Sequence, residues 1–476
     1  MSAFREYANY DGLGLAELLR RKQVTAPEIL DAALARIAAL NPKIGCVPLR
    51  MDEAARKQLA GGCAYGPFMG VPFLLKDLYL QLKGSPLTNG SRLFSDYVCA
   101  VDFTLTERYR AAGFIFAGRT TSPEFGLNMA SEPVNLGAAR NPWNTGHSPG
   151  GSSGGAAAAV AAGMVPIAHA TDGGGSIRIP ASNCGLVGLK TTRARNPAGP
   201  IVGEGWASLS VGHVVSRTVR DSAAVLDATA GPAEGDPYWC APPERSFRAE
   251  VGRDPGRLRI ALQTRPNSGV PVHAENVAAA KNAAKLCESL GHIVEEAAPQ
   301  YDHESLYESL WVLASAGIAA TVEARLKQLG RALEGDDLEP ATMALYKKGA
   351  AMPIWHYTRC VNAVHTIGRQ LAAFFRDYDV ALTPVAANPP LPIGARPSMK
   401  EPDWERFAAD LFQQIAFTPL YNVAGAPAMS VPLHWTADGL PIGVQLGAAY
   451  GNEAVLFRLA AQLEAAQPWF QKRPPL

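Results

Sequence analysis

The sequence predicts an α/β fold in which a central mixed β-sheet is covered on both faces by helices, with an additional helical layer that resembles a lid. Two observations predict this fold. Short apolar runs typical of buried strands alternate along the chain with segments of helical periodicity. The 476-residue chain is 47% hydrophobic and only 18% charged, so it can bury a large core and lacks the composition of a disordered protein or a coiled coil.

Residues 1–65 are predicted to form an N-terminal helical part. Thr25 and Glu28 have the spacing of a capping box, and an apolar stripe at helical spacing follows them from 29 to 37. Because proline cannot donate the hydrogen bond that a continuing helix needs, we expect Asn41-Pro42 to close this helix.

Residues 66–230 alternate strands with helices and are predicted to form the core of the fold. Two glycine-rich loops interrupt this segment at element boundaries, where binding sites commonly lie. The expected elements are a strand at 70–76, a helix at 105–112, a strand at 114–118, a glycine-rich loop at 150–155, an alanine-rich helix at 156–162, a strand at 165–170 and a second glycine-rich loop at 171–176.

The remaining sequence divides into a helical layer at 231–378 and a return to the core sheet at 379–476. In the helical layer we expect one strand, at 258–263. Strands are expected afterwards at 380–385, 428–431 and 442–446, and an amphipathic helix at 453–464. The helical layer is interpreted as a lid and not as a separately folding unit, so we expect residues 1–476 to form a single domain.

Charge and cysteine usage favour a cytoplasmic protein that acts on a small molecule. The 44 basic and 43 acidic residues leave a net charge of +1, which supplies no field for nucleic acid or anionic lipid. The start of the chain lacks a secretory signal pattern, and the apolar run at 156–168 is too short to span a bilayer. The seven cysteines show no C-x-x-C pattern. We therefore expect no metal, no cofactor, no nucleic-acid or membrane partner, and a monomer or a homodimer.

The two glycine-rich loops carry the candidate chemistry. Successive glycines allow main-chain N–H groups to point into one concavity, which can serve as an oxyanion hole beside a nucleophile such as Ser176. Lys76 follows an apolar run, so burial should lower its pKa and allow it to act as a base. Arg178 is expected to pair with Asp172 and brace the second loop, and Ser153 to stabilise the first loop.

These motifs resemble the amidase signature family of serine hydrolases in their order and spacing. The similarity covers nearly the whole chain, and the segments at 448–453 and 238–243 most resemble the branch that contains 6-aminohexanoate cyclic-dimer hydrolases and related aryl-amide or carbamate hydrolases. The sequence departs from the family at Gly173, where isoleucine or threonine is usual. The motifs are Gly-Val-Pro-Phe-Leu-Leu-Lys-Asp at 70–77, Gly-Gly-Ser-Ser-Gly-Gly at 150–155, Asp-Gly-Gly-Gly-Ser at 172–176 and Gly-Leu-Val-Gly-Leu-Lys at 185–190.

The resemblance implies a role for each matching residue. Ser176 is implied as the nucleophile, Ser152 as a bridging serine that follows a cis peptide bond, and Lys76 as the base. The main-chain N–H groups implied for the oxyanion hole are those of Gly173, Gly174, Gly175 and Ser176. The residues expected to contact the substrate are Gly151, Asn128 and Ser131.

The function implied is that of an amidase hydrolysing carbon–nitrogen bonds other than peptide bonds (EC 3.5 type). The expected substrate is a small, mostly apolar linear or cyclic amide, anilide or carbamate, cleaved through a Ser-cisSer-Lys triad and an acyl-enzyme. One alternative is a protein similar to the glutaminase component of a glutamine amidotransferase, acting within a complex. A third interpretation is an esterase in which Ser153 is the nucleophile of a G-x-S-x-G elbow, but that elbow needs a preceding strand, which 144–149 does not form.

Overall fold

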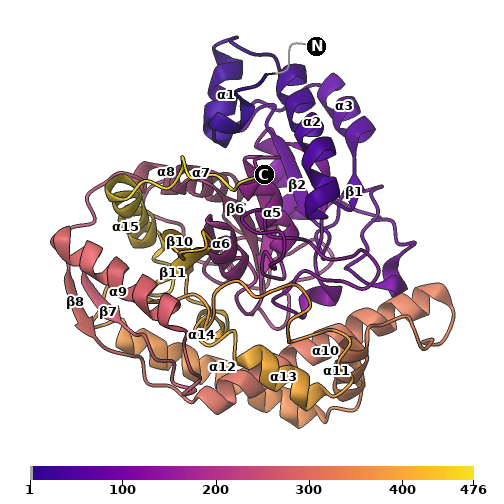
Figure 1. Ribbon diagram of the computed structural model, residues 1–476. Helices are drawn as coiled ribbons and strands as arrows, with labels where there is room; N and C mark the ends of the chain where they lie inside the picture. Colours follow the sequence, from indigo (N-terminus) through magenta and orange to yellow (C-terminus); the bar gives the residue numbers. More distant parts are fainter. Residues whose placement is uncertain (1–3) are drawn as a thin grey trace.

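The computed structural model describes residues 4–476 and contains one eleven-stranded mixed sheet. The strand order is β1-β3-β2-β4-β6-β5-β10-β11-β9-β7-β8, so strands from the last hundred residues lie in the middle of the sheet (Figure 1). The predicted mixed α/β architecture is confirmed. The strands are β1 (Leu49–Arg50), β2 (Pro72–Lys76), β3 (Ile115–Thr120), β4 (Ile167–Asp172), β5 (Val187–Lys190), β6 (Val211–Ser216), β7 (Arg259–Leu262), β8 (Ile293–Glu296), β9 (Val380–Pro384), β10 (Ala428–Trp435) and β11 (Pro441–Gly447).

Fifteen α-helices accompany these strands in the part of the chain from residue 4 onward. They are α1 (Gly12–Arg20), α2 (Ala26–Ile44), α3 (Asp52–Ala60), α4 (Thr104–Ala111), α5 (Gly154–Ala161), α6 (Arg178–Cys184), α7 (Val219–Thr229), α8 (Phe247–Glu250), α9 (Ala274–Ser289), α10 (His303–Leu329), α11 (Pro340–Ala350), α12 (Ile354–Phe374), α13 (Trp404–Phe412), α14 (Pro419–Ala424) and α15 (Glu453–Ala466).

The sheet is covered on both faces, as the alternation of side chains along β2 shows. Leu74 packs with the alanines of α5, whereas Phe73 and Leu75 pack with Tyr109 of α4 and Phe114 in a different core cluster. Successive side chains of a strand point to opposite faces, so α5 and α4 must lie on opposite sides of the sheet. Farther along the sheet, helices α9 and α15 pack with alternate residues of β11.

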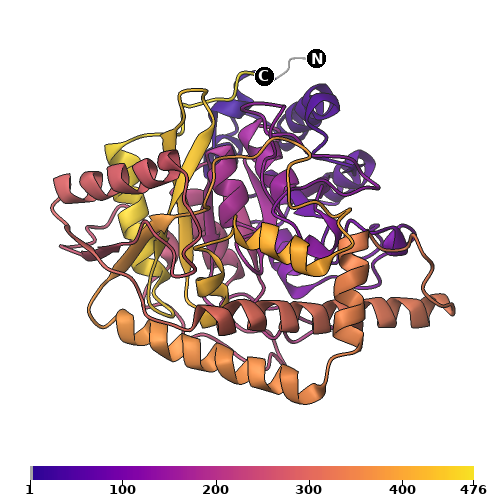
Figure 2. The same ribbon diagram turned by 60° about the horizontal axis from the view of Figure 1, so that its bottom comes forward.

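The long helices of the middle of the chain form a separate layer. Helix α10 packs lengthwise against α12 and contacts α11 (Figures 1 and 2). By length and composition, α10 is the one helix within residues 4–476 that is apolar enough to cross a membrane, but 56% of its most apolar window is buried inside the molecule. More than half of this apolar window is therefore covered by the protein itself.

Two expectations about individual elements were wrong. Pro42 does not close the second helix, because α2 continues to Ile44 and ends at Gly45, whose φ of 66° breaks the helical path. Pro42 lies in the last turn, where only one main-chain hydrogen bond is lost. The segment 231–378 contains two strands instead of one, because β8 pairs in parallel with β7 at the edge of the sheet. Its half-exposed sequence, Ile-Val-Glu-Glu, is too short and polar to stand out as a strand.

Candidate active site

The candidate residues meet at the carboxyl ends of two neighbouring parallel strands, β2 and β4. Lys76 is the last residue of β2, and it lies on the same face as Leu74, the face covered by α5. Strand β4 ends at Asp172, and the glycines 173–175 follow directly. Ser152 and Ser153 precede the first turn of α5. The topology therefore gathers three segments that are far apart in the sequence at a single edge of the sheet.

Lys76 is completely buried, and within the described residues 4–476 its ammonium donates only to hydroxyl groups. Its Nζ atom lies 2.7 Å from Ser152 Oγ, 2.9 Å from Ser153 Oγ and 2.8 Å from Thr171 Oγ1. Burial lowers the pKa of this ammonium well below its usual value, although the nearby Asp172 carboxylate opposes the effect. Asp77, the next residue, faces away and accepts hydrogen bonds from Thr88. A neutral lysine in contact with two serines can act as a base.

The two serines of the first loop have different surroundings. The peptide bond between Gly151 and Ser152 is cis, as the resemblance implied. Ser152 contacts Lys76 through its hydroxyl. Ser153 accepts the Thr171 main-chain N–H at 3.2 Å and donates to the Thr171 carbonyl at 3.1 Å. These two bonds tie the first loop to β4, which confirms the stabilising role expected for Ser153.

The second loop is held by a buried ion pair. Arg178 Nη2 lies 2.9 Å from Asp172 Oδ1, and Arg178 Nε lies 3.0 Å from Oδ2, so the expected pair is confirmed in bidentate form. Both side chains are fully buried. Although burial alone would raise the pKa of the Asp172 carboxyl, the Arg178 charge and its hydrogen bonds hold that pKa below its usual range. Asp172 therefore remains ionised, and the loop stays anchored to it.

The main-chain N–H groups of the glycine loop are not equivalent. The Gly175 N–H donates to Asp172 Oδ1 at 2.8 Å, so this group is already engaged and points toward the anchoring carboxylate. The N–H groups of Gly173, Gly174 and Ser176 have no partner in the described residues. The loop thus offers three free donors, one fewer than the sequence suggested.

Ser176 lies next to the first loop but is not joined to Ser152 by its hydroxyl. The Ser153 main-chain N–H donates to the Ser176 carbonyl at 3.2 Å, which brings the two loops together. Within residues 4–476, the Ser176 hydroxyl has no hydrogen-bond partner, and the residue is half-buried. Of the three residues implied as a triad, Lys76 and Ser152 are in direct contact, and Ser176 lies on the adjoining loop.

The three residues expected to contact the substrate lie together, but their polar groups are used within the protein. Gly151 packs so closely on the main chain at 128–130 that an added Cβ would lie 2.6 Å from the Asn128 carbonyl oxygen. Asn128 donates to the Pro397 carbonyl at 2.9 Å. Ser131 donates to the Gly150 carbonyl and accepts the Gly154 N–H, each at 3.0 Å. Gly151 and Ser131 thus hold the first glycine-rich loop in place, and Asn128 ties the adjoining segment to Pro397.

Comparison with known proteins decides the family. The family model described as Amidase matches residues 28–457, which is most of the chain. The chain belongs to the amidase family. The resemblance inferred from the sequence motifs is confirmed, and this amidase is accordingly a hydrolase of carbon–nitrogen bonds other than peptide bonds.

Individual relatives are similar over almost their full length. The amidase is 38% identical to a 6-aminohexanoate-cyclic-dimer hydrolase of Paenarthrobacter ureafaciens, over 98% of this chain and 96% of that protein. A solved structure of a 6-aminohexanoate cyclic dimer hydrolase superposes with a TM-score of 0.93 at 36% identity, covering 98% and 99% of the two chains. A bacterial aryl acylamidase structure gives 0.87 at 26% identity, covering 97% of each.

Several side chains that support the site were not identified from the sequence. The Asn422 amide donates to the Asp172 carbonyl and to Asp172 Oδ1, each at 2.9 Å. Gln445 Oε1 accepts from Arg178 Nη1 at 2.8 Å, and the Thr418 hydroxyl donates to the Gly174 carbonyl at 2.7 Å. Thr171 accepts from Lys76. Of these four, only Thr171 has a signal in the sequence, because it directly precedes the Asp172-Gly173 motif.

A cavity of about 550 Å³ opens beside this cluster. Thr171, which bonds Lys76, and His169 lie in its wall. Trp206 forms the partition toward the glycine loop, since a Cβ at Gly173 would lie 2.8 Å from its ring. At its mouth, Ile201, Val202 and Tyr238 are exposed apolar side chains. The size suits a small organic molecule, and the wall is predominantly apolar.

Proposed function

We propose that this amidase cleaves a small, mostly apolar amide, anilide or carbamate through an acyl-enzyme on Ser176. The observation that carries the proposal is the buried Lys76 ammonium, which donates to Ser152 Oγ at 2.7 Å and has a lowered pKa. The His169 imidazole does not take the place of this base, because its Nδ1 accepts the main-chain N–H of Lys76 and burial lowers its pKa well below the usual value. A neutral lysine relaying a proton through Ser152 fits these contacts.

In the first half of the reaction, neutral Lys76 takes the proton of Ser152 while Ser152 takes the proton of Ser176. Ser176 Oγ forms a bond to the substrate carbonyl carbon, and the carbonyl π electrons move to the oxygen. The free N–H groups of Gly173, Gly174 and Ser176 stabilise that oxyanion, with Gly175 held aside by Asp172. The contact from Ser152 to Ser176 forms in the substrate complex, since catalytic hydrogen bonds commonly tighten there.

In the second half, the carbon–nitrogen bond breaks and the departing amine receives a proton relayed from Lys76 through Ser152. Water then attacks the acyl carbon and gives a proton through Ser152 to Lys76. The bond between the acyl carbon and Ser176 Oγ breaks, and the same relay returns that proton to Ser176 Oγ as the acid product leaves. These residues and water account for every proton and bond in the cycle. We propose that the apolar part of the substrate occupies the cavity beside Thr171 and Trp206, and that the enzyme works in the cytoplasm as a monomer or a homodimer.

A substrate screen with the purified chain tests this proposal. Anilides, cyclic amide oligomers and aryl carbamates are compared with free glutamine, using product detection by chromatography and an ammonia assay. We expect hydrolysis of at least one apolar class, weak ammonia release from glutamine, and loss of all hydrolysis in Ser176→Ala. Rapid ammonia release from glutamine with no apolar substrate cleaved would contradict the proposal and favour the amidotransferase interpretation.

A further inference from the structure

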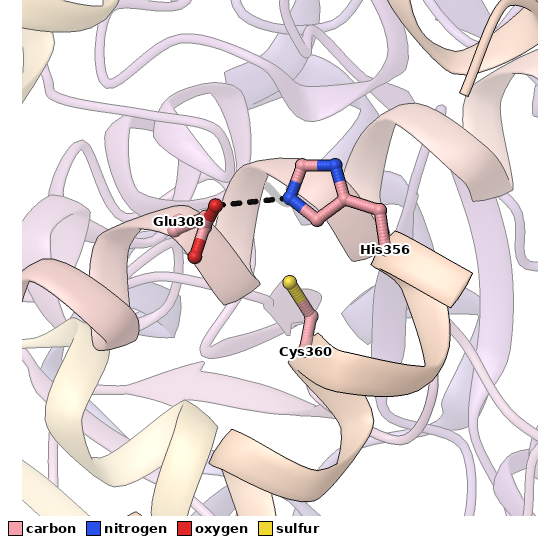
Figure 3. Close-up of side chains that lie close together, drawn as sticks. All are labelled: Glu308, His356 and Cys360. Atoms are coloured by element: carbon pink, nitrogen blue, oxygen red, sulfur yellow. Dashed lines mark hydrogen bonds and ion pairs between the residues drawn. The ribbon is translucent and has the colours of Figure 1, made fainter. Parts of the chain in front are cut away.

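A cluster of three potential metal ligands lies outside the candidate active site, between the long helices α10 and α12. Glu308 comes from α10, and His356 and Cys360 come from α12. Their ligand atoms all lie within 4.8 Å of one another. Figure 3 shows the carboxylate, the imidazole and the thiol converging on a common point. The proposed mechanism does not use these three side chains, although Cys360 also packs in the hydrophobic core.

The local structure explains why these side chains meet. His356 and Cys360 are four residues apart on one helix, so they lie on the same face, one turn apart. Helix α10 packs along that face, and its Ser309 hydroxyl donates to the Cys360 carbonyl at 3.3 Å. Cys360 is 1% exposed, while Glu308 is at the surface. The cluster therefore spans the boundary between the interior and the solvent.

We propose that Glu308, His356 and Cys360 bind a divalent ion of the zinc type, with one position left to water. Sulfur, imidazole nitrogen and carboxylate oxygen are the three donor types that zinc takes in proteins, commonly in a tetrahedral set. Binding requires that the Cys360 thiol lose its proton to solvent and that the His356 imidazole be neutral. No sequence pattern indicates this site, because the chain has no C-x-x-C or H-x-x-H here and the third ligand lies on another helix.

The present partners of Glu308 define what the ion must displace. His356 Nε2 lies 2.9 Å from Glu308 Oε1, and the same oxygen is paired with Arg359. Arg359 is 54% exposed and can swing into solvent. Arg359 therefore competes with the cation for the carboxylate, and removing its charge should strengthen metal binding. A purely structural ion pair would show no such gain.

Cobalt titration of the full chain, freed of metal with a chelator, tests the proposal. We expect one Co²⁺ per chain, a thiolate-to-cobalt charge-transfer band in the near ultraviolet, and displacement by Zn²⁺. Cys360→Ser should abolish the band, while His356→Gln and Glu308→Gln should each weaken binding by about tenfold or more. The control Cys63→Ser, at a partly exposed thiol, should change nothing. Arg359→Gln should bind more tightly.

Absence of binding by the intact chain, or equal binding by wild type and His356→Gln, would overturn the proposal. Glu308 is exposed and His356 only half-buried, so these two variants should fold even if Cys360→Ser does not. Melting temperature with and without Zn²⁺ gives a second readout. It should rise for the wild type, because the ion links α10 to α12 only in the folded state, and rise clearly less for the two variants at the same Zn²⁺ concentration.

Discussion

Lys76 is the residue on which the proposed chemistry depends most. It is fully buried, and among residues 4–476 its ammonium has three hydroxyl partners and no carboxylate at hydrogen-bond distance. Such an environment favours the neutral amine, which can accept a proton. The neighbouring Asp77 is directed to Thr88 and does not neutralise this effect.

The pH dependence of hydrolysis follows from the direction of the Lys76 pKa shift. Activity requires the neutral amine, so kcat/KM should rise as pH increases through the Lys76 pKa. Because burial lowers that pKa, the rise should occur well below the ordinary lysine value of about 10.4. Lys76→Met should lower kcat by about 10²- to 10⁴-fold. Steady-state rates measured from acid to alkaline pH check both expectations.

Lys190 provides the matched control, since it is also buried and has a lowered pKa but donates to the Thr191 carbonyl. Lys190→Met should leave the rising limb of the pH profile in place. A profile with its maximum near pH 5, or a nearly normal rate in Lys76→Met, would show that Lys76 is not the base.

Arg178 should be important for stability as well as for activity. Arg178→Met leaves the buried Asp172 carboxylate without its cation, and breaking a buried pair in this way costs about 3–5 kcal/mol. The exposed pair between Arg56 and Asp31 is the comparison, and Arg56→Met should cost less than about 1 kcal/mol. Urea unfolding gives both free energies. Equal losses in the two variants would contradict the anchoring role of Arg178.

At the scale of elements, the glycine loop after β4 is shaped by its neighbours. Gly173 stands where the family usually has a branched residue, and the Trp206 ring occupies the space that such a side chain would take. The same ring packs against Gly317 of α10, where an added Cβ would lie 2.8 Å from it. The departure at Gly173 is thus explained by the packing of Trp206.

Gly173→Ala should lower kcat by about tenfold to a hundredfold, because the Cβ forces the loop or Trp206 to move and misplaces an oxyanion donor. Adding Trp206→Ala should recover part of the loss by restoring room. Gly335→Ala, at a site with no atoms within 4 Å of the added Cβ, should have no effect. Initial rates of the wild type, the two single glycine variants and the double variant test this expectation. An unchanged rate in Gly173→Ala would contradict the assignment of this loop to the oxyanion hole.

Much of the candidate active site could be predicted from the sequence, because residues close together in the chain form its loops and the elements that flank them. The strand before Lys76, the alanine-rich helix and both glycine-rich loops all have local signals, and Arg178 follows its partner Asp172 by only six residues. Asn422 and Gln445 could not be predicted in the same way. They meet Asp172 and Arg178 from more than 240 residues away, and single amides carry no pattern.

At the scale of the molecule, the sheet explains how these distant residues come together. Strands β10 and β11 lie between β5 and β9, so the last hundred residues supply central strands. Gln445 comes from β11, and Asn422 from α14 just before β10. The candidate site is therefore assembled from the first half of the chain and from its last hundred residues. The order of the strands that brings them together could not be derived from the sequence pattern alone.

Trapping the covalent intermediate would decide whether Ser176 is the nucleophile. The amidase is mixed with an aryl carbamate, whose carbamoyl-enzyme should hydrolyse slowly, and the intact mass and proteolytic fragments are measured by mass spectrometry. We expect one added carbamoyl group, located on Ser176 and absent from Ser176→Ala, while Ser153→Ala still acquires it. A carbamoyl group on Ser153 or on another residue, or steady turnover with Ser176 unmodified and dispensable, would contradict the proposed acyl-enzyme.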